Sequence, residues 1–414
     1  MKIFTQQIPF DPAGRAVADT MPLKPGVWSV RFGSEKLMFS DEPPAPKAPG
    51  RGARIPSRDA DVSPEQLHIV VQNGRLFQQH HPEVPVLHDR GRFLLVKLDP
   101  RDARKLAKEA ETCYGVMPLA GEQVVFDEPA PAARAPVAFV KALADRVQRA
   151  SVEASLKKLV SFKTRHSTST TFSKAVTWAR KQMKDMGYTT RLQTITVSGK
   201  SSRNIIAEKA GSGSGKRSVI MATAHLDSVN LKDGPAAPAP GADDNGSGSA
   251  GLLEIARALQ SHHGVHDLRL VLFGGEEQGL FGSKQYVAGL SAAERSRIKA
   301  VVNMDMIGSV NTPVRSVLLE GAALSQTMID KLSEAAATYT QLKVETSLHP
   351  FNSDHVPFID AGIPCVLTIE GADNTNDRVH SANDTIDKVD YDLMVEILRM
   401  NVAFLADQIG AAPA

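Results

Sequence analysis

The sequence has few of the features that mark disulfide-rich, membrane-spanning or nucleic-acid-binding proteins. Its two cysteines, Cys113 and Cys365, are too far apart to form a disulfide framework, and this low usage fits a reducing compartment. Lys and Arg number 48 against 46 for Asp and Glu, so no overall field attracts nucleic acid or an anionic membrane. No apolar run approaches the roughly 18 residues of a membrane-spanning helix. We therefore expect neither nucleic acid nor a membrane as a partner.

The first residues also lack the apolar core of a secretory signal. Ile3 and Phe4 are followed at once by Thr5 and two glutamines, and charged residues come soon after. We therefore expect a cytoplasmic protein by default. A trimmed N-terminus or another export route would place it in the periplasm or outside the cell, and the sequence leaves that alternative and the oligomeric state open.

A change in composition divides the chain into two predicted domains. The Pro- and Ala-rich stretch 129–136 has little that could pack and reads as a linker. It separates a smaller α+β domain, residues 1–135, from a larger domain, residues 136–414. In the first, the patterns predict two strands and a helix: Leu67–Val71, Arg92–Leu98 and Ala103–Glu111. We expect this domain to resemble a prosegment that shields the cleft of the second, with a substrate-gating cap and an oligomerisation unit as the alternatives.

The larger domain alternates helical and strand-like segments. Helical periodicity covers Ala142–Phe162 and Ser173–Met186, and strands are predicted at Thr190–Val197 and Asn204–Glu208. Four further apolar runs have the length and composition of central strands: Ser218–Ala224, Leu268–Phe273, Ala300–Met304 and Cys365–Ile369. Such alternation predicts an α/β domain with a mixed, mostly parallel sheet covered by helices on both faces.

Polar side chains that can bind a metal follow these four runs, or lie in the loops after them. In open α/β sheets, ligand sites gather beyond the carboxyl ends of the strands, so these side chains are expected to converge. A Gly-rich loop, 241–248, carries adjacent acids that would be poor choices for a buried turn unless a cation neutralised them. The candidate residues are His225, Asp243, Glu276, Glu277, Asp305 and His380.

Imidazoles combined with carboxylates suit zinc, with cobalt or manganese as chemical substitutes. Six such groups are too many for one tetrahedral zinc with an open position. They suit two metal ions that share one carboxylate and lie about 3.5–4 Å apart. The sequence therefore predicts two zinc ions per chain.

Six motifs in this order resemble the two-zinc metallopeptidase family that includes bacterial leucyl aminopeptidases and glutamate carboxypeptidase. The motifs are His225-Leu-Asp227, Gly241-Ala-Asp-Asp-Asn-Gly-Ser-Gly248, Gly275-Glu-Glu-Gln-Gly-Leu-Phe-Gly-Ser283, Asn303-Met-Asp305, Ser353-Asp-His355 and His380-Ser-Ala-Asn-Asp-Thr385. The resemblance covers roughly residues 140 to 410. It implies a zinc-dependent exopeptidase fold and peptide substrates with a free terminus.

Carried over residue by residue, the resemblance implies a complete site. Asp243 takes the place of the bridging carboxylate, and a cis bond is implied between it and Asp244. The other ligands of one zinc are His225 and Asp305, and those of the second are Glu277 and His380. Glu276 is implied as the general base and Asp227 as the partner that orients His225.

The same resemblance implies aminopeptidase action. Glu276 would take a proton from a water bridging the two zinc ions as the water attacks the scissile carbonyl, and would pass it to the leaving amine. The metals and a donor near Ser353 would stabilise the oxyanion. The tyrosine that bacterial leucyl aminopeptidases have shortly before this serine is absent, so His349 or Asn352 is a candidate in its place.

Five alternatives to aminopeptidase action are weighed from the sequence. Carboxypeptidase and dipeptidase action are possible on the same scaffold. Glutaminyl cyclase chemistry uses one zinc, and the full ligand set disfavours it. A metal-binding module without catalysis is disfavoured by Glu276. Asp354 and His355 could belong to a serine-hydrolase triad, but the chain has no Gly-x-Ser-x-Gly motif, so a supporting role is expected.

Overall fold

The structure is a computed structural model that describes residues 1–8, 26–42, 57–109, 114–371 and 376–410, so Cys113 lies outside the described residues. The chain divides into two compact units. Unit 1 contains Met1–Pro131, together with Glu345–Leu348, Asn376 and Asp377, and unit 2 contains the rest of the chain from Ala132. The division falls inside the stretch 129–136 that the sequence marks as a linker.

Unit 1 is an α+β body with two sheets. The first sheet has the strand order β4-β1-β3-β2-β9 and the second has the order β6-β7-β5-β8. The strands of the first sheet are β1 (Lys2–Gln7), β2 (Trp28–Phe32), β3 (Glu35–Ser40), β4 (Ser57–Asp59) and β9 (Glu122–Phe126). Those of the second are β5 (Leu67–Gln72), β6 (Val86–Arg90), β7 (Phe93–Lys97) and β8 (Tyr114–Pro118).

The two strands predicted in this unit correspond to β5 and β7. Two helices accompany the sheets, α1 (Leu76–His80) and α2 (Pro100–Glu109). The predicted helix 103–111 corresponds to α2, which begins at Pro100 because proline suits the first turn of a helix. Residues 110 and 111 of that prediction lie outside the described residues.

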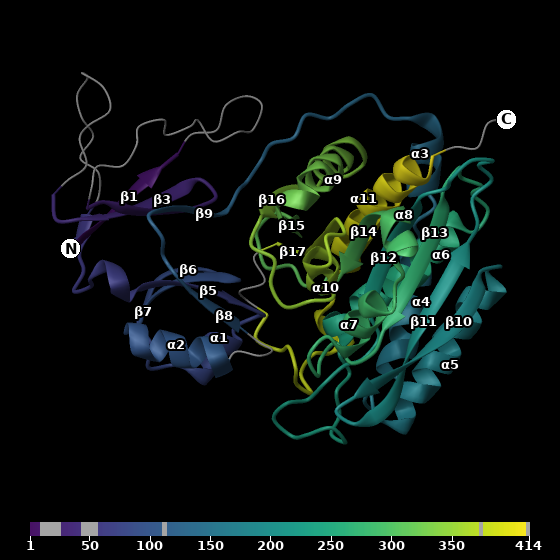
Figure 1. Cartoon of the computed structure of the whole chain (residues 1–414), viewed down its shortest axis with the longest axis horizontal. Helices are drawn as coiled ribbons and strands as arrows, with labels where there is room; N and C mark the ends of the chain where they lie inside the picture. The colour runs from purple at the N-terminus through teal and green to yellow at the C-terminus, as the bar shows by residue number, and fades with distance from the viewer. Residues whose placement is uncertain (9–25, 43–56, 110–113, 372–375, 411–414) are drawn as a thin grey trace. The chain divides into compact units, whose positions relative to one another are not determined.

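Unit 2 is built on one sheet with the strand order β10-β11-β13-β12-β14-β17-β15-β16 (Figure 1), although residues 345–347 of the last strand are grouped with unit 1. The strands are β10 (Thr189–Val197), β11 (Lys200–Lys209), β12 (Val219–His225), β13 (Asp267–Phe273), β14 (Ile298–Met304), β15 (Ser316–Glu320), β16 (Lys343–Ser347) and β17 (Cys365–Glu370). The central strands β13, β12, β14 and β17 pair in parallel, whereas β10, β11 and β15 pair antiparallel. The six strands that the sequence predicts here are confirmed, and the sheet is mixed with a parallel centre.

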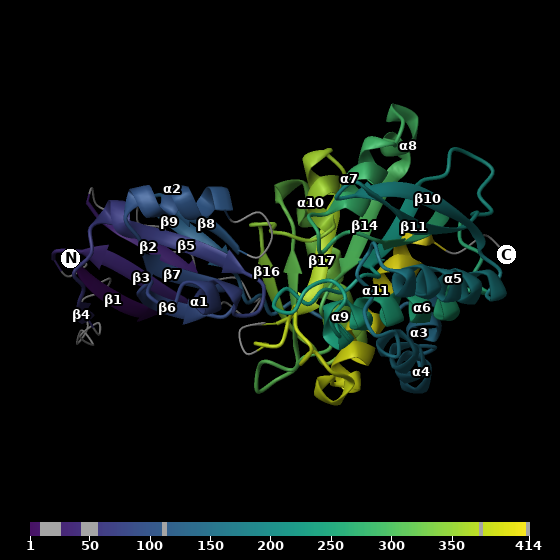
Figure 2. The ribbon, with the colours of Figure 1, turned by 90° about the horizontal axis from the view of Figure 1, so that it is seen from below.

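Helices cover both faces of this sheet (Figure 2). On one face lie α3 (Ala138–Ala144), α4 (Arg149–Val160), α5 (Thr170–Asp185), α6 (Gly248–Leu259), α9 (Gln326–Tyr339) and α11 (Tyr391–Ile409). On the other lie α7 (Phe281–Ala288), α8 (Ala292–Arg297) and α10 (His355–Asp360). Because side chains alternate along a strand, Ile220 and Ala222 of β12 enter the first core and Val219 and Met221 enter the second.

One predicted element is wrong in extent. The helix predicted over 142–162 is two helices, α3 and α4, separated by a turn at residues 145–148. At this turn the buried carboxylate of Glu254 accepts the Gln148 N–H at 2.5 Å. Both helices pack against the same core, so their apolar residues read as one periodic pattern. In the described part of the chain, no helix is both long and apolar enough to cross a membrane.

Candidate metal centre

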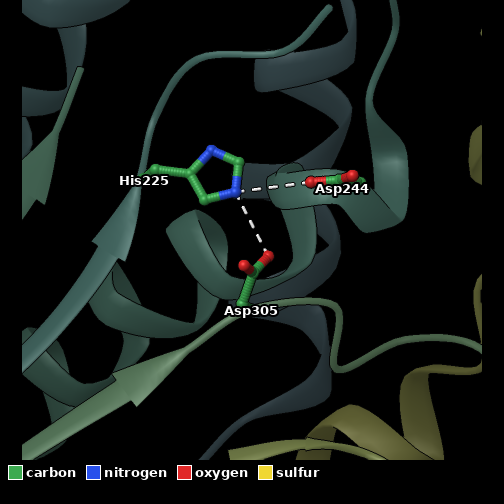
Figure 3. Close-up of side chains that lie close together, drawn as sticks. All are labelled: His225, Asp244 and Asp305. Atoms are coloured by element: carbon green, nitrogen blue, oxygen red, sulfur yellow. Dashed lines mark hydrogen bonds and ion pairs between the residues drawn. The ribbon is translucent and has the colours of Figure 1, made fainter. Parts of the chain in front are cut away.

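Two of the predicted ligands sit where parallel central strands end. His225 is the last residue of β12, and Asp305 directly follows β14. Because these strands are neighbours, their ends meet, and His225 Nε2 lies 3.1 Å from Asp305 Oδ1 (Figure 3). Both side chains are buried. The sheet therefore brings together residues 80 positions apart in the sequence.

A third carboxylate, that of Asp244, joins this pair to a second group. Asp244 Oδ1 lies 3.3 Å from His225 Nε2, as Figure 3 shows, and Asp244 Oδ2 lies 3.2 Å from His380 Nε2. His380 Nε2 is also 2.9 Å from Glu277 Oε2. The result is two triads, each with its ligand atoms within 4.8 Å of one another, and Asp244 belongs to both.

Asp244 therefore lies between the two halves of the site, whereas the sequence resemblance implies Asp243 as the bridging carboxylate. The carboxylate of Asp243 is occupied elsewhere: Oδ1 accepts the Gly308 N–H at 2.8 Å, and Oδ2 accepts the Ser309 hydroxyl at 2.6 Å. The cis peptide bond is likewise one residue later than predicted, between Asp244 and Asn245. Sequence cannot tell which of two adjacent aspartates faces a site, because their side chains diverge according to the local backbone.

The loop that carries Asp244 is fixed mainly through its backbone. Arg165, which is fully buried, donates Nη2 to Gly241 O at 2.8 Å and Nε to Leu226 O at 2.8 Å. It thereby connects the loop to the segment that contains His225. On the other side, the carboxylate of Asp384 accepts the N–H groups of Asp243 and Asp244, both at 2.9 Å.

Sequence reasoning assigned no role to Arg165 or Asp384. Arg165 has no sequence signal, because a lone arginine between polar residues is usually exposed. Asp384 did have a sequence signal, because it lies in the motif 380–385, four residues after His380.

The predicted supporting residues also lie in the site. Asp227 is fully buried, its Oδ1 is 3.5 Å from His225 Nδ1, and its Oδ2 accepts the Glu277 N–H at 3.3 Å. Glu276 is buried and lies close enough to His225 and Asp305 to interact electrostatically with both. Its backbone carbonyl accepts the N–H groups of Gly279 and Leu280, each at 2.8 Å, which fixes the turn.

A chain of hydrogen bonds holds Asp305 from behind. The hydroxyl of Ser353 donates to Asp305 Oδ2 at 2.6 Å, and Asn303 Nδ2 donates to Ser353 Oγ at 2.9 Å. The Ser353 proton is thus committed to Asp305 and is not available to an oxyanion. Asp354 and His355, the next two residues, are fully buried.

One ligand and two residues near the ligands have a left-handed backbone that is uncommon outside glycine. Leu280, Met306 and His380 have φ of 60°, 53° and 56°. Met306 directly follows Asp305, and Leu280 closes the turn that contains Glu276 and Glu277. Such conformations cost free energy and concentrate at functional sites.

The site concentrates buried negative charge. Eight carboxyl groups of the site are buried: Asp227, Asp243, Asp244, Glu276, Glu277, Asp305, Asp354 and Asp384. The buried arginine beside them, Arg165, donates its side-chain hydrogen bonds to backbone carbonyls. Burying an ionised carboxylate without a partner is costly.

The pKa shifts show this cost. Burial, followed by repulsion from Asp244, raises the pKa of Glu277 to about 7. Burial, followed by repulsion from Asp243, raises the pKa of Asp384 to about 8. Burial also raises the pKa of Glu276 well above its usual value, although His225 opposes this.

The pKa of Asp244 is shifted in the opposite direction from those of Glu276, Glu277 and Asp384. Burial alone would raise its pKa, but hydrogen bonds with His225 and His380 outweigh burial and hold the pKa well below the usual value. The two oxygens of Asp244 thus face one imidazole nitrogen each. A carboxylate in this position can serve two cations at once.

This donor set fits divalent metal ions. Each triad combines one imidazole with carboxylates, a combination that zinc accepts, and two cations would neutralise much of the surplus negative charge. Each triad alone leaves room for a further ligand in a tetrahedral shell. The five side chains His225, Asp244, Asp305, Glu277 and His380 therefore make a coherent site for a metal pair.

Comparison with known proteins places the chain among peptidases. Residues 204–405 match the model described as Peptidase family M28. The chain is 39% identical over 210 residues to leupeptin-inactivating enzyme 1 of Streptomyces exfoliatus, covering 49% of this chain and 44% of the relative. It is 32% identical over 204 residues to aminopeptidase YwaD of Bacillus subtilis, covering 49% and 43%. The chain thus spans less than half the length of these two relatives.

A third relative is matched over most of its length. The probable leucine aminopeptidase of Arthroderma otae is 30% identical over 266 residues, which cover 61% of this chain and 70% of the relative.

Solved structures confirm the fold. The LapA aminopeptidase of Legionella pneumophila superposes with a TM-score of 0.60 at 20% identity, covering 85% of this chain and all of that chain. An aminopeptidase from Aneurinibacillus sp. strain AM-1 gives 0.57 at 19% identity, covering 66% and 97%.

The loop geometry yields a prediction for Gly241. Its φ is +50°, and an added Cβ would lie 2.4 Å from Asp244 O and 2.5 Å from Ser228 Cβ. Gly187 has a similar backbone, with φ of +85°, but open space around it. We expect Gly187→Ala to lose about 1 kcal/mol of unfolding free energy, from backbone strain alone. Gly241→Ala should lose about 2 kcal/mol more, because the loop must also move. Urea unfolding of both variants measures the difference, and equal losses would contradict the described packing.

Proposed function

The chain belongs to peptidase family M28, and we propose that it is a zinc-dependent aminopeptidase that removes residues from the free N-terminus of peptides. The observation that carries this proposal is the position of Asp244, whose two carboxylate oxygens face one ligand triad each. The family relatives support it, because several are named as leucine aminopeptidases or aminopeptidases.

We propose two zinc ions per chain. One would be held by His225, Asp305 and Asp244, and the other by Glu277, His380 and the same aspartate. Bound zinc supplies Lewis acidity, which makes a carbonyl more electrophilic and a water molecule more acidic. Asp227 stands behind His225 and would keep its imidazole turned toward the site.

Glu276 is the proposed general base. Its carboxylate is buried beside the ligands and is not part of either triad, so it is free to exchange a proton. It would take the proton of the attacking water and deliver it to the leaving amine of the cleaved peptide bond. A raised pKa suits this double role, because it makes the Glu276 carboxylate a stronger base toward the attacking water.

The donors for the oxyanion are proposed to come from the segment that ends at Ser353. Ser353 itself is committed to Asp305, so His349 and Asn352 remain the proposed alternatives to the absent tyrosine. Asn352 has a left-handed backbone, with φ of 40°, and the N–H of neighbouring Phe351 is fixed by Glu320 at 2.9 Å. The segment is therefore held in a defined shape.

Unit 1 is proposed as an accessory domain. It has its own buried residues, including Phe32, Phe39, Leu67 and Phe77, as expected of a body that folds around a separate core. The shielding role predicted from the sequence stays a prediction.

Substitutions of the two adjacent aspartates test which of them is the bridging ligand. We expect Asp244→Asn to lose both zinc ions, because it weakens a ligand of each triad. Asp243→Asn should keep them, because its carboxylate faces Gly308 and Ser309. Zinc content per chain after dialysis, measured by mass spectrometry, checks this. Loss of zinc from Asp243→Asn with retention in Asp244→Asn would restore the assignment made from sequence.

Variants of the two adjacent glutamates distinguish a loss of catalysis from a loss of metal binding. Glu276→Gln removes the proton acceptor but no ligand, so hydrolysis of an amino-acid anilide should fall by about 10²- to 10⁴-fold with zinc content unchanged. Glu277→Gln removes a ligand and should lower zinc content as well. An unchanged rate in Glu276→Gln would show that this residue is not the base. An inactive wild-type protein with two zinc ions bound would favour a binding module.

The choice of terminus is tested with peptides of one sequence. We expect an N-acetylated peptide to resist cleavage and a C-amidated peptide to be shortened from its N-terminus, because a free amino group is the proposed recognition element. Mass spectrometry of the products over time records which end is removed. Cleavage of only the N-acetylated peptide would indicate a carboxypeptidase, and cleavage of dipeptides alone a dipeptidase.

A further inference from the structure

We propose that Asp384 is a positioning residue that sets the shared carboxylate of Asp244 between the two triads. This inference rests on the proposed function, because it concerns the same metal pair. Asp384 belongs to neither triad. Its effect would be exerted through the backbone of the residue that belongs to both.

One residue holds three consecutive backbone N–H groups of the ligand loop. The carbonyl oxygen of Asp384 accepts the Ala242 N–H at 3.1 Å. Its carboxylate then accepts the Asp243 N–H on Oδ1 and the Asp244 N–H on Oδ2, both at 2.9 Å. The position of the backbone at Asp244 therefore depends on the position of Asp384.

The location of Asp384 connects these backbone hydrogen bonds to the second triad, which contains His380. It lies four residues after His380, in the same short segment, and is buried with 2% of its surface exposed. His380 faces Asp244 Oδ2 at 3.2 Å. The segment thus contacts the shared aspartate twice, through its imidazole at the side chain and through Asp384 at the backbone.

A carboxylate is the acceptor that this geometry requires. Two adjacent N–H groups that point the same way need two acceptor atoms, and a carboxylate supplies both. An amide of the same shape has one acceptor oxygen and would turn its NH₂ toward the other donor. The loop is already fixed at Gly241 by Arg165, so the change should displace residues 243 and 244 rather than the whole loop.

The matched control is Glu254. It is also a buried carboxylate that accepts a backbone N–H, from Gln148, but it lies on α6 and interacts with Arg257, away from both triads. A substitution there imposes a similar loss of hydrogen bonding without touching the ligand loop. The Glu254 variant therefore shows how much zinc affinity changes when a buried acid with only a structural role is replaced.

The test compares zinc affinity in Asp384→Asn, Glu254→Gln and the wild-type full chain by competition with a chromogenic chelator. We expect Asp384→Asn to bind zinc about 10- to 100-fold more weakly, as for other residues that orient ligands. Glu254→Gln should bind zinc as the wild type does. Cobalt absorption spectra of the same proteins should change in Asp384→Asn alone, because the ligand geometry changes.

If Asp384→Asn does not fold, Asp384→Ala in formate takes its place, because formate restores a two-oxygen acceptor in the space that is left. Recovery of zinc affinity with formate, and not with chloride, supports the inference. Wild-type affinity in Asp384→Asn overturns it, and so does failure of both variants to fold, which would make Asp384 a residue of the fold. A wild-type protein that binds no zinc overturns the proposed function instead.

Discussion

The burial of many carboxylates at one place is the constraint on which the site depends. Eight acidic side chains of the site are removed from water, and the guanidinium of Arg165 is buried beside them. At the low effective dielectric of such a place, repulsion is strong and several pKa values rise toward neutrality. A pair of divalent ions would relieve this repulsion, and the ionised Asp244 stands where both ions could share it.

The fold meets this constraint by fixing the backbone and leaving the ligand atoms free to face the site. The parallel strands β12 and β14 deliver His225 and Asp305 to one edge of the sheet. Asp244, Glu277 and His380 lie on loops, which need other hydrogen bonds to hold them in place. Arg165, Asp384 and Asp227 form these hydrogen bonds with backbone groups. The rigidity of the centre therefore comes from residues that no metal would touch.

Much of this could be predicted from the sequence, because strand ends and motif order are local signals. The apolar runs before His225 and Asp305 predict the strands that carry them. What failed depended on tertiary detail. The choice between Asp243 and Asp244 turns on which way two successive side chains leave one loop. Arg165 looks like a surface residue, because nothing in the neighbouring sequence shows that three of its hydrogen-bond acceptors lie more than 60 positions away.

Anomalous diffraction at the zinc edge, from crystals grown with zinc, would locate the metal ions. We expect two peaks per chain, one beside His225 and Asp305 and one beside Glu277 and His380, with one oxygen of Asp244 directed at each. A single peak, no peak, or two peaks bridged by another residue would contradict this expectation.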